Sequence, residues 1–221
     1  MVSNVYKIGK TKLRIKGKFG KKVNDFMANL FLKQQRIIES KIGLTFEELN
    51  TQIEEKYRTP ASEDRIIKLK STLKNDYHAY TQHFTQIEFT GIKPTKVVKI
   101  RYVFAYPSPC KNGIENVMSH ELGHELIFKY ALLFFPKLLD NEISGLVFDP
   151  ERSSYGYRGE GFCELLGALT INQLHTRLPS KDKNYNIAFE QAKEEYLKTE
   201  DLRRFLEEFI IKKLRNIFGH E

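Results

Sequence analysis

The segment NVMSHELGHEL, residues 116–126, contains two histidines four positions apart. On an α-helix, positions i and i+4 share one face, so His120 and His124 can offer two imidazole nitrogens to a single tetrahedral ion. Glu121 lies about 100° around the helix from His120 and cannot easily bind the same ion. It can instead reach a water molecule beside the ion, which is the position of a general base. The spacing therefore predicts a helix with a metal-binding face.

The surrounding residues predict that this segment lies within a long, anchored helix. Asn112, followed three residues later by Glu115, signals a helix start, and Pro136 should end the helix near residue 135. Gly123 leaves space between the two histidines. Four apolar residues can anchor the helix in a core, namely Val117, Met118, Leu122 and Leu126. This context favours a structured site over a surface helix that happens to contain two histidines.

A third metal ligand is expected from RGEGFCELLGAL, residues 158–169, because a catalytic zinc ion has three protein ligands and leaves the fourth position to water. Glu160 begins a predicted helix over 160–175 that can pack antiparallel to the first, and Glu164 follows one turn later on the same face. One carboxylate can bind the metal while the other accepts the second N–H of a ligand histidine. Cys163 could compete for zinc as a thiolate, but a buried core thiol is the favoured interpretation.

These motifs resemble those of the gluzincin metallopeptidases, in which HExxH is followed by a glutamate on a second helix. GEGFCE, residues 159–164, is similar to the NEGFA segment of their aminopeptidase branch. The resemblance covers about residues 95–175 and implies Glu160 as the third zinc ligand and Glu164 as the orienting residue. The 35 residues between His124 and Glu160 exceed the usual spacing of that branch, and its GxMEN segment is not found. An endopeptidase is therefore the expectation.

The resemblance also implies a mechanism, in which one catalytic zinc ion assists peptide hydrolysis and Glu121 acts as the general base. The oxyanion of the tetrahedral intermediate needs a further donor, and gluzincins use a Tyr or His for this task. Tyr157 is the first candidate because it flanks the Glu160 segment; the others are Tyr155, Arg158 and His175. The predicted strand over 96–106 corresponds to the edge strand that pairs with an extended peptide substrate in such folds.

The patterns along the chain predict an α+β protein that is mainly helical, with a zincin-like catalytic domain, an active-site helix, a short sheet and a helical N-terminal region. A hairpin is expected near 11–19, a strand over 96–106, and a long functional connection over 136–158. The further helices are expected over 23–38, 45–57, 62–89 and 185–218. Gly91 and Pro94 suggest a boundary between an N-terminal region, 1–92, and a metallopeptidase domain, 93–221.

The 221 residues carry a formal charge of +8, which favours acidic partners. Residues 7–22 contain eight basic and no acidic residues, so they form either a solvated hairpin face or a contact for nucleic acid or an acidic protein. The alternative function is accordingly a binding protein for such partners with a structural or degenerate HExxH site. The N-terminal region could also act as an inhibitory prosegment, although no Cys or Asp switch motif supports this.

The two cysteines, Cys110 and Cys163, are too few for a disulfide framework and are expected as reduced thiols, with a single bridge as the alternative. The N-terminal residues lack the apolar run of a secretory signal, which predicts a cytoplasmic protein unless it is exported without a signal. The most apolar stretch, LIFKYALLFFP (126–136), is too short for a membrane span, so no membrane association is expected.

Overall fold

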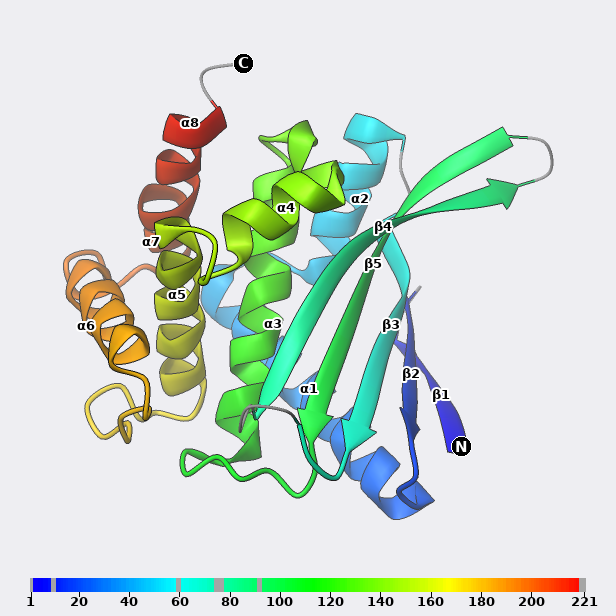
Figure 1. Cartoon of the computed structure of the whole chain (residues 1–221), viewed down its shortest axis with the longest axis horizontal. Coiled ribbons are helices and arrows are strands. Elements are labelled where there is room, and N and C mark those ends of the chain that lie inside the picture. Colours follow the sequence, from blue (N-terminus) through cyan, green and yellow to red (C-terminus); the bar gives the residue numbers. More distant parts are fainter. Residues whose placement is uncertain (1, 9–10, 59–60, 74–77, 91–92, 219–221) are drawn as a thin grey trace.

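The computed structural model describes residues 2–8, 11–58, 61–73, 78–90 and 93–218 (Figure 1). The N-terminal half contains β1 (Val2–Ile8), β2 (Thr11–Gly17), α1 (Lys21–Ile42), α2 (Phe46–Tyr57), β3 (Ala61–Lys70), β4 (Ala79–Thr90) and β5 (Lys93–Ala105). The rest is helical, with α3 (Gly113–Leu132), a 3-10 turn η2 (Pro136–Leu139), α4 (Asn141–Phe148), α5 (Ser154–Thr170), α6 (Lys183–Leu197), α7 (Leu202–Phe205), a π-helical turn η3 (Leu206–Ile211) and α8 (Lys212–Phe218). The expectation of a mainly helical α+β protein is confirmed.

The five strands form one mixed sheet in the order β1-β2-β3-β5-β4. The strand β3 pairs in parallel with both β2 and β5, whereas β1 and β4 run antiparallel to their neighbours. Parallel neighbours need a crossover connection, and α1 with α2 supplies the one between β2 and β3. The two edge strands are therefore β1 and β4.

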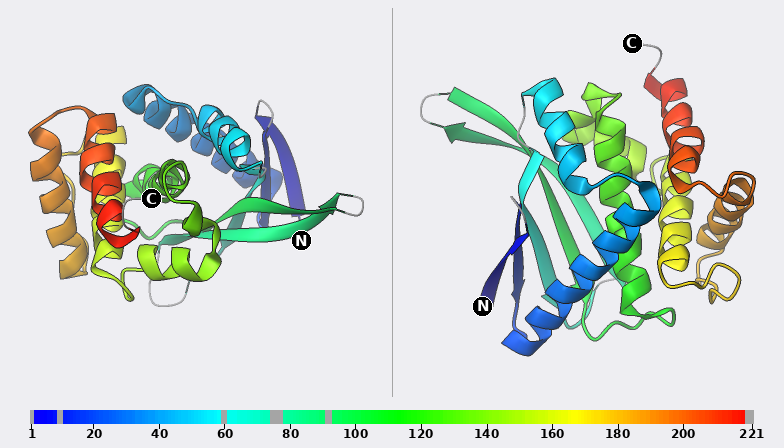
Figure 2. Two further views of the ribbon diagram at one scale, coloured as in Figure 1. Left: turned by 90° about the horizontal axis from the view of Figure 1, so that it is seen from above. Right: turned by 180° about the vertical axis from the view of Figure 1, so that it is seen from behind.

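The helices α1, α2 and α3 lie on one face of this sheet, and α5 to α8 lie on the side of α3 away from it (Figures 1 and 2). Alternate strand residues point into the core between sheet and helices, among them Ile15, Ile67, Ile100 and Phe104, each at most 1% exposed. The four predicted anchors of α3 are also buried, as expected. Since α3 contacts the sheet on one side and α5 on the other, it occupies the centre of the fold.

Several predicted elements are confirmed. The strand β2, the helices α1 and α2, the strand β5 and the helix α3 lie where the patterns placed them, but the hairpin expected near 11–19 is formed by β2 with the preceding strand β1, which was not predicted. Thr45 caps α2 through the full capping box with Glu48, whose backbone N–H donates to the threonine hydroxyl. Both cysteines are free. Among the described residues, none of the helices combines the length and apolarity that a bilayer span requires.

The helix predicted over 62–89 is wrong, because this region forms β3 and β4. The connection over 136–158 is not an irregular loop, since it contains η2, α4 and the start of α5. The helix expected to start at Glu160 begins at Ser154 and ends at Thr170, and the tail helix is interrupted between Leu197 and Leu202. The predicted boundary after residue 92 falls between β4 and β5, two strands that pair over most of their length.

The predicted edge strand is also wrong in one respect. Residues 93–105 do form a strand, but β5 lies between β3 and β4. Its backbone is paired with a neighbouring strand on both sides. The edge beside α3 belongs to β4, the strand that was taken for a helix. Unpaired backbone groups are therefore offered on this side by β4 and not by β5.

Candidate metal centre

The imidazoles of His120 and His124 point to the same side of α3, one helical turn apart. Their Nε2 atoms lie 3.1 Å from each other, and both side chains are mostly buried. Two donors bound to one tetrahedral zinc ion at about 2.0–2.1 Å would lie about 3.3 Å apart. The pair is therefore spaced as two ligands of a single metal ion would be.

The carboxylate of Glu160, on α5, completes a triangle with these nitrogens. Its Oε2 atom lies 3.0 Å from His120 Nε2, and its Oε1 atom lies 3.5 Å from His124 Nε2. Both distances are close to the edge of a zinc tetrahedron, about 3.3 Å. The Oε2 atom is buried and has no other described polar partner than the His120 ring. Two nitrogens and one carboxylate group, which turns a different oxygen to each histidine, thus lie close together, an arrangement that suits a cation.

Cys163 brings a fourth donor close to the same point. Its Sγ atom and one donor atom of each histidine lie within 4.8 Å of one another, so His120, His124 and Cys163 also form a cluster that could hold a metal. Burial, followed by the charges of Glu160 and neighbouring carboxylates, raises the pKa of the Cys163 thiol well above its usual range. The thiol is therefore protonated at neutral pH, whereas Glu160 is an anion.

Gly123 explains how the helices that carry these donors come so close. A Cβ atom at Gly123 would lie 3.0 Å from Cys163 Sγ and 3.2 Å from a methyl carbon of Leu166. The space expected between the two histidines is thus filled by the α5 side chain of Cys163. Gly167 has a similar effect nearer the start of α3, because its Cβ would lie 2.9 Å from the Asn116 side chain.

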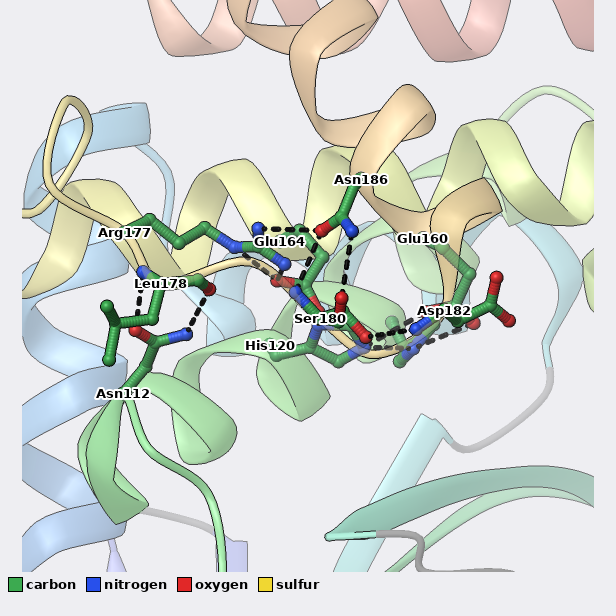
Figure 3. A network of polar contacts seen from close by, with 10 residues as sticks. Asn112, His120, Glu160, Glu164, Arg177, Leu178, Ser180, Asp182 and Asn186 are labelled. Carbon is green, nitrogen blue, oxygen red and sulfur yellow. Dashed lines mark hydrogen bonds and ion pairs between the residues drawn. The ribbon is translucent and has the colours of Figure 1, made fainter.

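A second carboxylate holds the other nitrogen of His120. Glu164 Oε1 lies 3.3 Å from His120 Nδ1, and its Oε2 accepts hydrogen bonds from Arg177 Nε and Nη2, at 2.8 and 2.5 Å (Figure 3). Arg177 also stacks over the ring of Phe189. A carboxylate at the second nitrogen of a ligand histidine fixes its tautomer and ring orientation. The geometry therefore agrees with the orienting role expected for Glu164.

The segment that supplies Arg177 is fastened to both neighbouring helices. Asn112, just before α3, exchanges two hydrogen bonds with the backbone of Leu178, and the Asn186 side chain bonds Ser180 at both its N–H and its C=O (Figure 3). Arg177 is 4% exposed as a result. Sequence reasoning missed this residue, because nothing in its local pattern marks it as a partner of Glu164.

The protonation of the centre follows from these contacts. Burial disfavours a charged imidazole at His120, but the hydrogen bonds and charges of Glu160 and Glu164 outweigh it and raise the pKa of His120 well above its usual value. Burial likewise opposes the Glu160 anion, but the two histidines outweigh it and hold the pKa of that carboxyl well below its usual range. Without a metal, a proton on His120 balances these carboxylates; a divalent cation could replace it.

Glu121 points to the sheet. Its Oε2 atom accepts a hydrogen bond of 2.5 Å from the hydroxyl of Thr81 on the edge strand β4. Burial raises the pKa of Glu121, and the nearby imidazoles of His120 and His124 oppose that rise. A buried carboxylate with a raised pKa, beside nitrogens that could hold a metal, has the properties of a general base. Thr81 was missed because β4 was interpreted as a helix.

The strand β4 brings a further histidine to α3. The ring of His83 stacks on Phe128 with centroids 4.4 Å apart, and it hydrogen-bonds to the backbone of His124. Burial, followed by the charge of His124, lowers the pKa of His83 to about 3. His83 is therefore neutral at physiological pH and packs as an aromatic ring against α3.

A buried charge cluster anchors the sheet-facing side of α3. Glu125 Oε1 receives hydrogen bonds from Arg65 on β3 at 3.1 and 2.8 Å and lies 2.7 Å from the Nζ atom of Lys129. Tyr102 donates to the other oxygen of Glu125, and Lys129 donates to Asn50 on α2. Arg65, Glu125 and Lys129 are all essentially unexposed. The cluster joins α3 to both β3 and α2 and so fixes the helix that carries the histidines.

The contacts given for the candidate oxyanion donors are with residues other than His120, His124 and Glu160. Tyr155 donates its hydroxyl to the backbone of Ile210, and Arg158 stacks over Phe209, both toward the C-terminal helix. The Tyr157 hydroxyl accepts a hydrogen bond from Asn184 on α6 at 3.3 Å. The tyrosines and Arg158 help to line a pocket of about 500 Å³ between α5, α6 and α8. His175 is exposed in the connection after α5. Tyr157 as a donor stays a prediction.

Comparison of the chain with models of protein families, with curated proteins and with solved structures gave no match. The assignment of a function therefore depends on the chemistry of the site itself.

Proposed function

We propose that the protein is a zinc-dependent metallopeptidase of the gluzincin type, with a zincin-like fold, that hydrolyses internal bonds of peptide or protein substrates. One observation carries the proposal: two imidazole nitrogens lie 3.1 Å apart, and each has one of the two oxygens of the Glu160 carboxylate beside it, at 3.0 and 3.5 Å. The adjoining Glu121 carboxylate adds a base to this donor set. Two imidazoles and one carboxylate are a ligand set that zinc accepts in catalytic sites.

In this proposal His120, His124 and Glu160 hold the ion, and Glu164 with Arg177 keeps the His120 ring in its orientation. Zinc, when bound, supplies positive charge that polarises a scissile carbonyl and acidifies water. Glu121 accepts the proton that the attacking water loses and returns it to the leaving amine. The hydrogen bond from Thr81 occupies Oε2 of Glu121, so Oε1 is the atom left to take up that proton.

The position of β4 supports a peptide as substrate. Because β4 is the edge strand beside α3, its outer backbone groups can pair with an extended chain that passes in front of Glu121. The strand is tied to the neighbouring elements by Thr81, which bonds Glu121, and by Thr85, which donates to the carbonyl of Leu139. A substrate strand paired with β4 would therefore have a fixed position relative to His120, His124 and Glu160.

Elemental analysis of the purified full-length protein tests the metal site. We expect about one zinc ion per chain, lost in His120→Ala and in Glu160→Gln but retained in Glu121→Gln. Cys163→Ser serves as a control for the alternative ligand. Zinc lost in Cys163→Ser but retained in Glu160→Gln would transfer the third ligand to the thiol. A folded wild type that binds no zinc even when zinc is supplied would refute the proposal.

Hydrolysis of a library of internally quenched fluorescent peptides tests the activity. We expect Glu121→Gln to lose at least about 100-fold in kcat/KM while it keeps its zinc, because the base is absent. Thr81→Val should lose about tenfold, since a hydrogen bond to a charged group is removed; Thr85→Val is its matched control on the same strand. Zinc bound by the wild type, with no peptide cleaved, would indicate the structural or degenerate site of the alternative hypothesis.

A further inference from the structure

The face of the sheet that points away from α1, α2 and α3 is strongly basic. No helix of the described part of the chain lies over this face, which is turned to the viewer in Figure 1 and lies behind the helices in the right view of Figure 2. The strand registers place the outward residues of neighbouring strands side by side, for example Lys16 with Lys68. We call this surface the open face; its cations are Lys7, Lys12, Arg14, Lys16, Lys68, Lys70, Lys99 and Arg101.

The basic segment of residues 7–22 contributes only some of these charges. Its alternate residues on β1 and β2 point to the open face, whereas Lys18 lies after β2, and Lys21 with Lys22 occupies the first turn of α1. The strands β3 and β5, from the middle of the chain, supply the other cations. Folding therefore gathers charges that are up to about ninety positions apart in the sequence onto one surface.

Among the side chains that the structure describes on the open face, cations far outnumber acids. Among the side chains that the structure describes there, the acid is Glu88, and it already pairs with Lys99. Partial burial, and then the charges of three surrounding cations, lower the pKa of Lys68; these cations are Arg101, Lys16 and Lys70. Like charges held this close destabilise the protein unless an anion binds between them.

Aromatic rings lie among the cations. Phe84 on β4 pairs in register with Lys99 and so points to the same face, and the guanidinium of Arg101 lies 5.1 Å from the centre of its ring. Tyr80, four residues earlier on β4, has the same orientation by the alternation of the strand. Both rings are partly exposed. A flat basic surface with accessible rings offers phosphate contacts together with platforms on which unpaired bases can stack.

We propose that the open face of the sheet binds single-stranded nucleic acid. Cations two positions apart on a strand lie about 6.7 Å apart, so the face presents a regular array of positive charge to a polyanion of repeating charge. The rings of Phe84 and Tyr80 favour a nucleic acid with exposed bases over an acidic protein, because carboxylate side chains gain nothing from stacking. The surface lies on the side of the sheet opposite α3, so binding there leaves the metal donors accessible.

Fluorescence anisotropy of a labelled oligonucleotide of about 20 thymidines tests the proposal, with the full-length protein in about 50 to 300 mM NaCl. The test variant combines Lys16→Gln, Lys68→Gln and Arg101→Gln. Its matched control combines Lys198→Gln, Lys212→Gln and Lys213→Gln, which remove the same charge from exposed positions on the C-terminal helices. Circular dichroism checks that both variants are folded. The readout does not depend on zinc or on peptide hydrolysis.

We expect the wild type to bind and the open-face variant to lose at least about tenfold in affinity, with a salt slope smaller by about 2 for three lost phosphate contacts. The control variant should stay within about twofold of the wild type. Phe84→Ala should weaken binding at least about fivefold and leave the salt slope unchanged, because stacking is not an ionic contact.

Three results would overturn the proposal. The first is no binding at the lowest salt concentration. The second is an equal loss in the open-face and control variants, which would show that net charge alone is sensed. The third is equally tight binding of polyglutamate, together with an unaltered oligonucleotide affinity in Phe84→Ala. That result would assign the open face to an acidic protein.

Discussion

Lys129 offers a quantitative test of the electrostatics that hold α3, the helix of His120 and His124. Its ammonium group is fully buried with Glu125 and Arg65, and burial, only partly offset by Glu125, lowers its pKa from 10.5 to about 8. Between these two values the unfolded chain binds a proton that the folded protein does not. The free energy of unfolding therefore rises with pH across this interval. Each pH unit is worth about 1.4 kcal/mol, so the rise attributable to Lys129 is about 3 kcal/mol.

The substitution Lys129→Met isolates this contribution, because it removes the titrating group and keeps a side chain of similar length. Urea denaturation of both proteins at several pH values gives the difference in unfolding free energy between variant and wild type. We expect this difference to fall by about 3 kcal/mol between about pH 7 and about pH 10.5, to the disadvantage of the variant. Tyrosines and other shared groups titrate in both proteins and cancel in the difference.

Lys198→Met, at a side chain that is 64% exposed, is the control and should show a difference that stays within about 0.5 kcal/mol at every pH. A difference for Lys129→Met that is constant within about 1 kcal/mol across the range would refute the reasoning. It would mean that Glu125 fully compensates the buried ammonium and that the cluster behaves as a neutralised pair.

Three further predictions concern the assembly of the site. Gly123→Ala should lower zinc affinity at least about tenfold, because the new methyl group would meet Cys163 Sγ at 3.0 Å and push α5 from α3; isothermal titration of the metal measures this, and unchanged affinity would contradict it. Arg177→Met should lower zinc affinity by about 10- to 100-fold through the released Glu164, whereas Arg177→Lys should restore some of it. Removal of residues 1–92 should unfold the protein, since it deletes four of five strands, and higher peptidase activity in the truncated chain would instead support the prosegment hypothesis.

The sequence predicted the helical parts of the site well because their signals are local. The spacing of His120 and His124 needs only helix geometry, and the following Glu160 and Glu164 lie one turn apart on the next long helix. The structure brings all four side chains together through the close packing of α3 and α5. What the residue pattern alone left open was the choice between Glu160 and Glu164 as the ligand, which depends on three-dimensional distances to the two nitrogens of His120.

The strands β3 and β4 escaped prediction because their inward positions are polar. In β3, the buried residue Arg65 interrupts the apolar alternation that continues with Ile67, since its charge is compensated by Glu125 from α3. In β4, the inward positions include Thr81 and His83, which contact α3. Polar side chains that point inward to contact other polar groups interrupt the apolar–polar alternation of an ordinary strand. Strand prediction from that alternation therefore fails beside the candidate site.

The strand order has a consequence for the synthesis of this protein. Because β4 pairs in the sheet only with β5, which follows it in the chain, a nascent chain that ends before Ala105 holds its edge strand without a partner. The donor atoms then emerge in two steps, the histidines on α3 first and the carboxylates on α5 some forty residues later. At translation rates of about 5–20 residues per second, this separates the two sets of side chains by a few seconds. The four side chains can therefore come together only after most of the chain has been made, and assembly of the cluster becomes a late event of folding rather than its nucleus.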